Sequence, residues 1–120
     1  MNRILFAFLM ISTLVSSCFY DSEENLYPNN DCFTESVSFL YDIKPIFEAS
    51  CFKCHSAAAN LGNVNLSTHT AVIKYSVNGS LVGSVKHVAG FVKMPEGAPK
   101  MDVCKISKIE TWVQAGSPNN

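Results

Sequence analysis

Arginine is almost absent from this chain of 120 residues. Nine residues are lysine or arginine, and Arg3 is the only arginine among them. Ten acidic residues leave a formal net charge of −1 at pH 7, so no basic surface is expected. Because nucleic-acid binding depends on clustered positive charge, the composition gives no support to a nucleic-acid partner. Charged residues of both signs make up only 16% of the chain, which argues against long disordered segments except at the ends.

The chain also lacks an apolar run long enough to cross a bilayer. The run over residues 4–15 follows one positive charge and precedes small residues, whereas a membrane-spanning helix needs roughly 20 apolar residues. This order of features is typical of a secretory signal peptide, which we expect to cover residues 1–17. A buried strand or helix of the domain is the alternative. A signal peptide implies export to an oxidising compartment.

A cysteine directly follows this leader. Residues 15–18, VSSC, resemble the lipobox of bacterial lipoproteins, in which the leader is cut before a cysteine that then carries lipid. The resemblance implies that Cys18 is the first mature residue and anchors the exported protein to a bacterial membrane, facing the periplasm or the cell surface. Residues 18–36 then form a lipid-anchored tether and N-terminal segment, which is acidic and interrupted by Pro28. An ordinary secreted protein is the alternative.

Residues 51–55 read CFKCH, a C-x-x-C-H motif. This pattern is the attachment signature of haem c. On a helix, Cys51 and Cys54 lie on one face about a turn apart, so each thiol can form a thioether with one vinyl group of the same porphyrin. His55 follows at once, and its imidazole can bind the iron. We therefore expect one haem c per chain, held covalently so that it is not lost outside the cell.

Two other interpretations of this motif stay open. A structural zinc module needs four nitrogen or sulfur ligands, and the chain has neither a second C-x-x-C nor a histidine pair at ligand spacing. His69 and His87 are instead expected to be exposed helix histidines. A redox dithiol needs C-x-x-C beside a βαβ pattern, and the sequence shows no such strands.

Iron in an electron carrier is normally bound on both faces. Met94 stands in the loop FVKMPEGAPK, where Pro95 stiffens the backbone directly after it. We predict Met94 as the second axial ligand, with Met101 and His87 as alternatives. Met101 stands at the start of the last expected helix, where methionine commonly fills core space. Histidine and methionine ligation together raise the reduction potential of haem.

Hydrophobic periodicity predicts an all-α domain over residues 37–120. Its first helix contains Ile43, Ile46 and Phe47 at helical spacing. Asp42 stands just before them and is a plausible N-cap, because its side chain can accept a hydrogen bond from the first turn.

Three further helices are expected downstream. Two short ones span residues 68–76 and 80–87, and each carries apolar residues for a core. A last helix spans residues 103–115 and has an apolar stripe on one face. Asp102 can cap this helix, and Gly116 ends it.

Three stretches in order, IKPIFEASCFKCH, KMPEG and IETWVQAGS, resemble the class I c-type cytochromes. Within that class the chain is most similar to the planctomycete-type single-haem cytochrome c domain, over residues 37–117. The resemblance implies a small cytochrome c-like fold of about four to five short helices wrapped around one haem. It also implies electron transfer, with His55 and Met94 as axial ligands. The matching positions are Ile43, Pro45, Ile46, Cys51, Cys54, His55, Met94, Pro95, Trp112 and Gly116.

The function expected from these features is that of a membrane-anchored mono-haem electron carrier rather than an enzyme. It would meet redox proteins transiently, and no small-molecule substrate is evident. Lys53, Lys93 and Lys100 stand near the expected haem edge and could steer an acidic partner, although solvated lysines without a role are the simpler explanation. The alternative is a haem-based sensor or peroxidase-like enzyme, which needs a displaceable sixth ligand.

The cysteine count leaves one pair unassigned. Of the five cysteines, Cys18 is assigned to lipid, and Cys51 and Cys54 are assigned to haem. Free thiols do not persist in an oxidising compartment, so Cys32 and Cys104 are expected to form a disulfide. Two unpaired buried cysteines are the alternative.

We predict that the exported protein contains this disulfide. It closes a loop of about 70 residues, so reducing it should lower the free energy of unfolding by about 4 kcal/mol in the chain-entropy model. Proteolytic mass mapping without a reductant checks the linkage. Free thiols at both Cys32 and Cys104 would contradict it.

Overall fold

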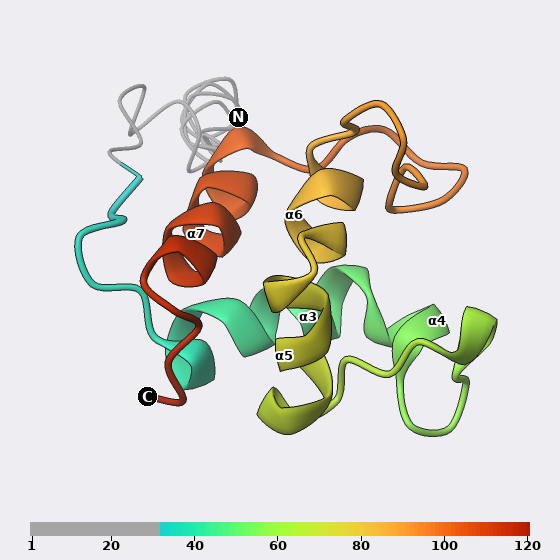
Figure 1. Cartoon of the computed structure of the whole chain (residues 1–120), viewed down its shortest axis with the longest axis horizontal. Helices are drawn as coiled ribbons and strands as arrows, with labels where there is room; N and C mark the ends of the chain where they lie inside the picture. The colour runs from blue at the N-terminus through green and yellow to red at the C-terminus, as the bar shows by residue number, and fades with distance from the viewer. Residues whose placement is uncertain (1–31) are drawn as a thin grey trace, which may run out of the picture. The chain divides into compact units, whose positions relative to one another are not determined.

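Short helices joined by loops make up residues 32–120, the part of the chain that the computed structural model describes (Figure 1). No strand occurs among these residues, so the prediction of an all-α domain is confirmed for them. The wrapping of these helices around a haem stays a prediction. None of the helices within residues 32–120 combines the length and apolar character needed to span a bilayer. The expected signal peptide, Cys18 and most of the expected tether lie outside the described residues.

The helices follow one another closely along the chain. A π-helical turn runs directly into the first α-helix, and a second α-helix starts after a single intervening residue. The elements in order are η1 (Phe39–Ile43), α3 (Lys44–Ser50), α4 (Phe52–His55), the 3₁₀ turn η2 (Leu61–Asn63), α5 (His69–Val77), α6 (Ser80–Val85) and α7 (Val103–Gln114).

The first helical segment begins at Phe39, before the residue expected to cap it. Ser38 is the cap: its Oγ accepts a hydrogen bond from the Tyr41 amide at 3.3 Å. Asp42 Oδ2 reaches back and accepts a hydrogen bond from the Ser38 amide at 3.0 Å. Two amides at the helix start are thereby satisfied reciprocally, as in a capping box. The prediction of Asp42 as the N-cap is therefore wrong, because its carboxylate supports the cap from within the helix.

The core is built from apolar side chains of η1, α3, α5, α6 and α7. The ring of Phe39 packs against Trp112, with 5.5 Å between the centroids, and His69 meets Phe39 edge-on at 4.9 Å. His69 Nε2 also lies 2.8 Å from the Ser117 carbonyl oxygen, so this histidine is half-buried rather than exposed as expected. The buried apolar residues are Val37, Phe39, Ile43, Ile46, Phe47, Leu66, Val72, Leu81, Val85, Ile106, Ile109 and Trp112.

The last residues of the chain return to the start of η1. Asn120 Oδ1 accepts a hydrogen bond from the Phe39 amide at 2.8 Å. The backbone oxygen of Asn120 accepts hydrogen bonds from the Leu40 amide at 2.9 Å and from Ser38 Oγ at 2.7 Å. Early amides of η1, which have no partner within the helix, therefore find acceptors on the segment after α7.

The ends of α7 agree with the sequence. Asp102 Oδ1 accepts hydrogen bonds from the amides of Cys104 at 2.9 Å and Lys105 at 3.3 Å, which confirms its predicted role as the cap. Gly116 follows the helix with a φ of 87°, a left-handed value that glycine adopts without strain. In the first turn, Cys104 forms a disulfide with Cys32, with 5.4 Å between the Cα atoms. The disulfide predicted from the cysteine count is therefore present in the structure.

We predict that Asp42 contributes to stability near neutral pH. Lys108 Nζ donates a hydrogen bond to Asp42 Oδ1 at 2.8 Å, and both side chains are 26% exposed. This hydrogen bond, with a smaller one from the Ser38 amide, outweighs partial desolvation and lowers the pKa of Asp42 below its ordinary 3.8. Because the folded-state pKa is the lower one, the stabilisation is complete above the unfolded-state pKa and is lost as the pH falls through the folded-state value.

Asp42→Asn should therefore lower the free energy of unfolding at pH 7 by about 1 kcal/mol. In strong acid the variant and the parent should converge, because the parent carboxylate is then protonated. Urea unfolding at both pH values measures the difference. Glu48→Gln is the control, since its pair with Lys44 spans 3.8 Å on exposed side chains and should contribute little. An equal loss in both variants would contradict the prediction.

Candidate cofactor site

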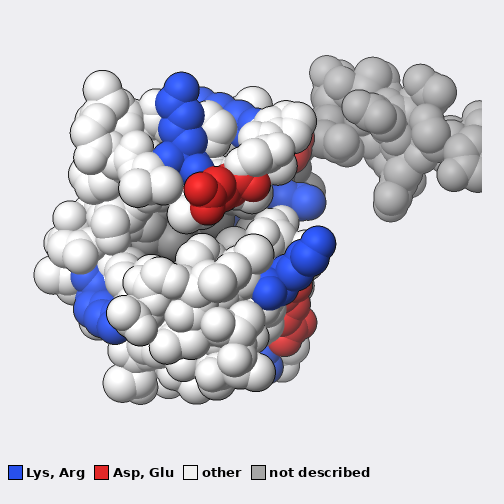
Figure 2. Space-filling model, turned by 90° about the vertical axis from the view of Figure 1, so that its right-hand side faces the viewer, with Lys and Arg blue, Asp and Glu red and all other residues white. Residues whose placement is uncertain are grey.

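A cavity of about 540 Å³ opens between the C-x-x-C-H segment and the loop that joins α6 to α7. This volume falls within the range of roughly 300–1,000 Å³ that is usual for cofactor and ligand sites. Figure 2 looks onto the face on which α4 and that loop lie; it is hollowed and mostly uncharged, with lysines near its edges. The cavity is lined by Cys51, His55, Leu61, Gly62, Val64, Leu66, Tyr75, Ser80, Leu81, Ser84, Val85, Gly90, Phe91, Val92, Met94 and Glu96.

The C-x-x-C-H motif spans a break between two helices. Cys51 separates α3 from α4, with a φ of −124°, so the continuous helix assumed from the sequence is interrupted there. The Cys51 carbonyl nevertheless accepts hydrogen bonds from the amides of Cys54 at 3.0 Å and His55 at 2.8 Å. The three motif residues therefore stay within one turn of backbone. Cys51 and His55 line the cavity, whereas Cys54 is half-buried beside it and is not among the lining residues.

The imidazole of His55 is oriented by a backbone carbonyl. His55 Nδ1 lies 3.2 Å from the Leu61 carbonyl oxygen. A carbonyl oxygen can only accept, so Nδ1 carries a hydrogen, and in the neutral imidazole Nε2 then keeps a free lone pair. Histidines that bind metals usually donate their other ring N–H in this way, which fixes the tautomer and the ring orientation. The Leu66 amide also donates to the His55 carbonyl oxygen at 2.8 Å, so backbone and side chain are both anchored.

The thiols of the motif lack the character of a redox dithiol. Cys51 and Cys54 form no disulfide with each other. Burial raises the pKa of Cys51 to about 11, and the neighbouring Cys54 adds to the rise. Reactive dithiols need a lowered pKa, because the thiolate is the nucleophile. The dithiol interpretation therefore gains no support from the site.

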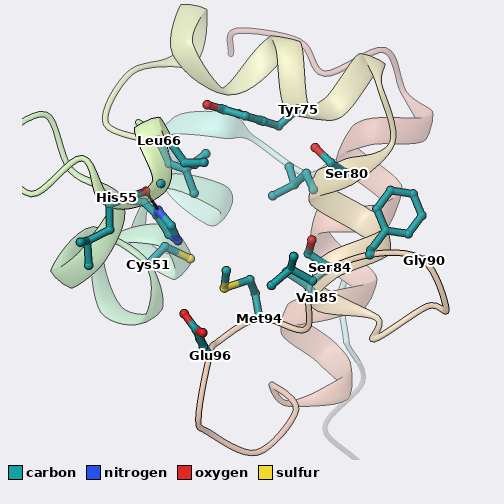
Figure 3. A pocket seen from close by; sticks show the side chains of 16 residues that line it. Cys51, His55, Leu66, Tyr75, Ser80, Ser84, Val85, Gly90, Met94 and Glu96 are labelled. Carbon is teal, nitrogen blue, oxygen red and sulfur yellow. Dashed lines mark hydrogen bonds between the residues drawn. The ribbon is translucent and has the colours of Figure 1, made fainter.

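Met94 enters the same cavity from the opposite wall. Figure 3 shows the sulfur atoms of Cys51 and Met94 facing the same space, with His55 beside Cys51. The Met94 amide donates a hydrogen bond to the Ser84 carbonyl oxygen at 3.1 Å, so the backbone of this loop residue is fixed to α6. Met94 is separated from the motif by 39 positions in sequence, from His55 to Met94, yet the fold places both on one cavity.

The two alternative ligands are placed elsewhere. Met101 does not line the cavity and packs against the hydrophobic core, as expected for a methionine at the start of α7. His87 also lies outside the lining, and its Nε2 is 3.0 Å from the Met94 carbonyl oxygen. His87 has a φ of 58° and lies beyond the end of α6, so the expectation of an exposed helix histidine is wrong.

A cluster of side chains suited to a structural metal ion is absent from residues 32–120. There, no group of three or more histidine, cysteine, aspartate or glutamate side chains is arranged to hold a metal ion. A structural zinc site needs four ligands, so the zinc interpretation finds no supporting cluster in this part of the chain.

Charges near the cavity are few. Lys53, Lys93 and Lys100 are exposed, and the structure pairs none of these three with an acidic side chain. Glu96 is the acidic residue among those that line the cavity, and Figure 3 shows it near Met94. The cavity wall is otherwise largely apolar, which suits the flat apolar face of a porphyrin.

Sequence reasoning missed one close contact in the cavity wall. The ring of Phe91 lies against Gly83 in α6, and a Cβ added at Gly83 would clash with the Phe91 ring. An isolated glycine inside a helical pattern is a signal of close approach, but it does not identify the partner. Tyr75 and the Leu61 carbonyl were missed because no spacing rule points to them.

Comparison with protein-family models, with curated proteins and with solved structures gives no match for this chain. The assignment of a function therefore depends on the residues of the site and their geometry. These residues fit a haem c: a free thiol and an oriented imidazole on one wall, a methionine thioether on the other and apolar side chains between them.

We predict that Gly83→Ala destabilises the protein when Phe91 is present and stabilises it when Phe91 is replaced by alanine. In the parent chain the new methyl group must displace the Phe91 ring, which should lower the free energy of unfolding by about 1 kcal/mol. In a Phe91→Ala background the clash is gone, and the better helix propensity of alanine should raise the free energy of unfolding by about 0.5–1 kcal/mol. Urea unfolding of the four proteins measures this coupling. Equal effects in both backgrounds would show that Phe91 does not occupy this position.

Proposed function

We propose that this protein is a membrane-anchored mono-haem c-type cytochrome that carries single electrons. One observation carries the proposal: Cys51 and His55 of the C-x-x-C-H motif share a cavity with Met94, which comes from a distant loop. A motif match alone is a local pattern. A methionine side chain on the facing wall, at a cavity volume suited to a cofactor, is an independent feature that a chance match would lack.

Each site residue has a specific role in this proposal. Cys51 and Cys54 would hold the porphyrin through thioethers, and His55 Nε2 and the Met94 sulfur would bind its iron. Bound haem c supplies a one-electron iron couple. The protein holds the group, orients it and limits water at its apolar face. A methionine thioether on the iron sets a high reduction potential relative to a second histidine.

The proposed location depends on the N-terminal residues of the chain, and the proposed partners depend on lysines at the surface of the domain. A leader over residues 1–17 and lipid on Cys18 would export the chain and tether it to a membrane. Lys53, Lys93 and Lys100 are exposed without acidic partners and are available to steer an acidic redox protein. Such encounters bury little surface, so the complexes are expected to be transient.

A haem-based sensor or peroxidase-like enzyme is the second candidate. Two features favour it: Met94 stands on the loop between α6 and α7 rather than on a helix, and Glu96 lines the cavity two residues later. A methionine that leaves the iron readily would open a site for a small ligand beside a carboxylate. Carbon monoxide separates the two functions, because rapid binding to the reduced protein at neutral pH favours the sensor or enzyme, and slow binding or none favours the carrier.

We predict that Met94→Ala abolishes the weak charge-transfer band near the red end of the oxidised spectrum. Loss of the thioether removes the sulfur ligand that gives rise to this band. Met101→Ala is the matched control, because Met101 packs against the core and should leave the band intact. Optical spectra of the exported proteins, oxidised and reduced, make the comparison.

Two results would contradict this assignment at different levels. Loss of the band in Met101→Ala but not in Met94→Ala would move the axial ligand to Met101 and leave the function unchanged. A mature chain whose mass contains amino acids and lipid but no macrocycle would overturn the proposed function itself.

A further inference from the structure

Helix α6 ends in a Schellman motif at an unusual residue. The Val88 amide donates to the Gly83 carbonyl oxygen at 2.9 Å, and the His87 amide donates to the Ser84 carbonyl oxygen at 3.2 Å. These two bonds are the pair that defines the motif, and His87 occupies its left-handed position with a φ of 58°. Glycine is the usual residue there, because a side chain at positive φ is strained. A histidine at this position needs a compensating interaction.

The side chain of His87 supplies that interaction. Its Nε2 lies 3.0 Å from the Met94 carbonyl oxygen, and since a carbonyl only accepts, Nε2 is the donor. On the other side of the same residue, the Met94 amide donates to the Ser84 carbonyl oxygen at 3.1 Å. Ser84 thus accepts from both Met94 and His87. The peptide groups on both sides of the Met94 Cα are fastened to the end of α6, one by backbone and one by imidazole.

This double attachment matters because few other bonds hold the loop. Within the described residues, the backbone hydrogen bonds that leave residues 88–101 for α6 start at Val88 and Met94. The remaining ones, from Phe91 to Val88 and from Ala98 to Pro95, stay inside the loop. The direction of the Met94 side chain therefore depends on the clamp formed by Ser84 and His87.

We propose that His87 is a positioning residue that holds Met94 against the cavity. The part of this inference that concerns iron ligation rests on the proposed function; the part that concerns the loop does not. His87 itself is not among the residues that line the cavity. Its donor Nε2 restricts the backbone at Met94, so fewer conformations turn the thioether away from the cavity.

The test compares His87→Gly with His87→Gln in the full-length exported protein. Glycine removes the imidazole and also removes the strain at positive φ, so overall stability should stay equal or rise. The clamp should nevertheless weaken, and exchange of the Met94 amide hydrogen should accelerate about fivefold, the change expected for one neutral hydrogen bond. Glutamine carries an N–H donor at a similar reach and should restore slow exchange. A residue with a general structural role would instead lose stability in His87→Gly.

The haem-loaded protein provides a second readout. In His87→Gly, carbon monoxide should bind the reduced protein about fivefold more readily, because Met94 leaves the cavity wall more often. His87→Gln should return toward the parent. Lys105→Ala is the control and should leave carbon monoxide binding at the parent value, because Lys105 is exposed on α7 and does not line the cavity.

The outcomes separate this inference from the proposed function. Unchanged exchange at Met94 in His87→Gly would overturn the inference, whether or not haem is bound. Faster exchange together with unchanged carbon monoxide binding would overturn the ligand-positioning role. If mass spectrometry finds no haem in the parent chain, the proposed function fails, and amide exchange still decides whether His87 holds the loop.

Discussion

Aromatic packing between η1 and α7 is the interaction on which the rest of the structure depends. Trp112 is fully buried, lies 5.5 Å from Phe39 between ring centroids, and donates its indole N–H to the Pro118 carbonyl oxygen at 2.9 Å. Because η1 continues directly into α3 and the C-x-x-C-H segment, its position sets that of one cavity wall. Because α7 packs on α6, the same contact also sets the wall that carries Met94. The contact between Phe39 and Trp112 therefore positions both walls of the cavity.

Local signals in the sequence predicted some helix ends and missed others. Helix α7 was predictable because an N-cap aspartate, an apolar stripe and a terminal glycine agree on its bounds. The start of η1 was not, because Asp42 and Ser38 both have side chains able to cap and only the backbone decides between them. The end of α6 was also missed: His87 continues the helical pattern in sequence but takes a left-handed conformation that sequence patterns assign to glycine.

The candidate site was predictable where its chemistry is local. Cys51, Cys54 and His55 fall within five consecutive residues, and Met94 was identified by its loop context; the structure places Cys51, His55 and Met94 on one cavity. That these residues bind haem stays a prediction. The supporting contacts were not predictable. A carbonyl that orients an imidazole, or an aromatic ring that packs on a glycine, produces no periodic pattern in the sequence. Such contacts join residues from different elements, whereas spacing rules describe one element at a time.

The disulfide between Cys32 and Cys104 determines where mechanical load enters the domain. Tension applied through the chain before Cys32 passes across the sulfur–sulfur bond into the first turn of α7. This path bypasses the segment from residue 33 to residue 38, which leads to Phe39. A pull on the N-terminal side of the domain therefore also acts on the longest described helix, and not on the short turn that begins the fold alone.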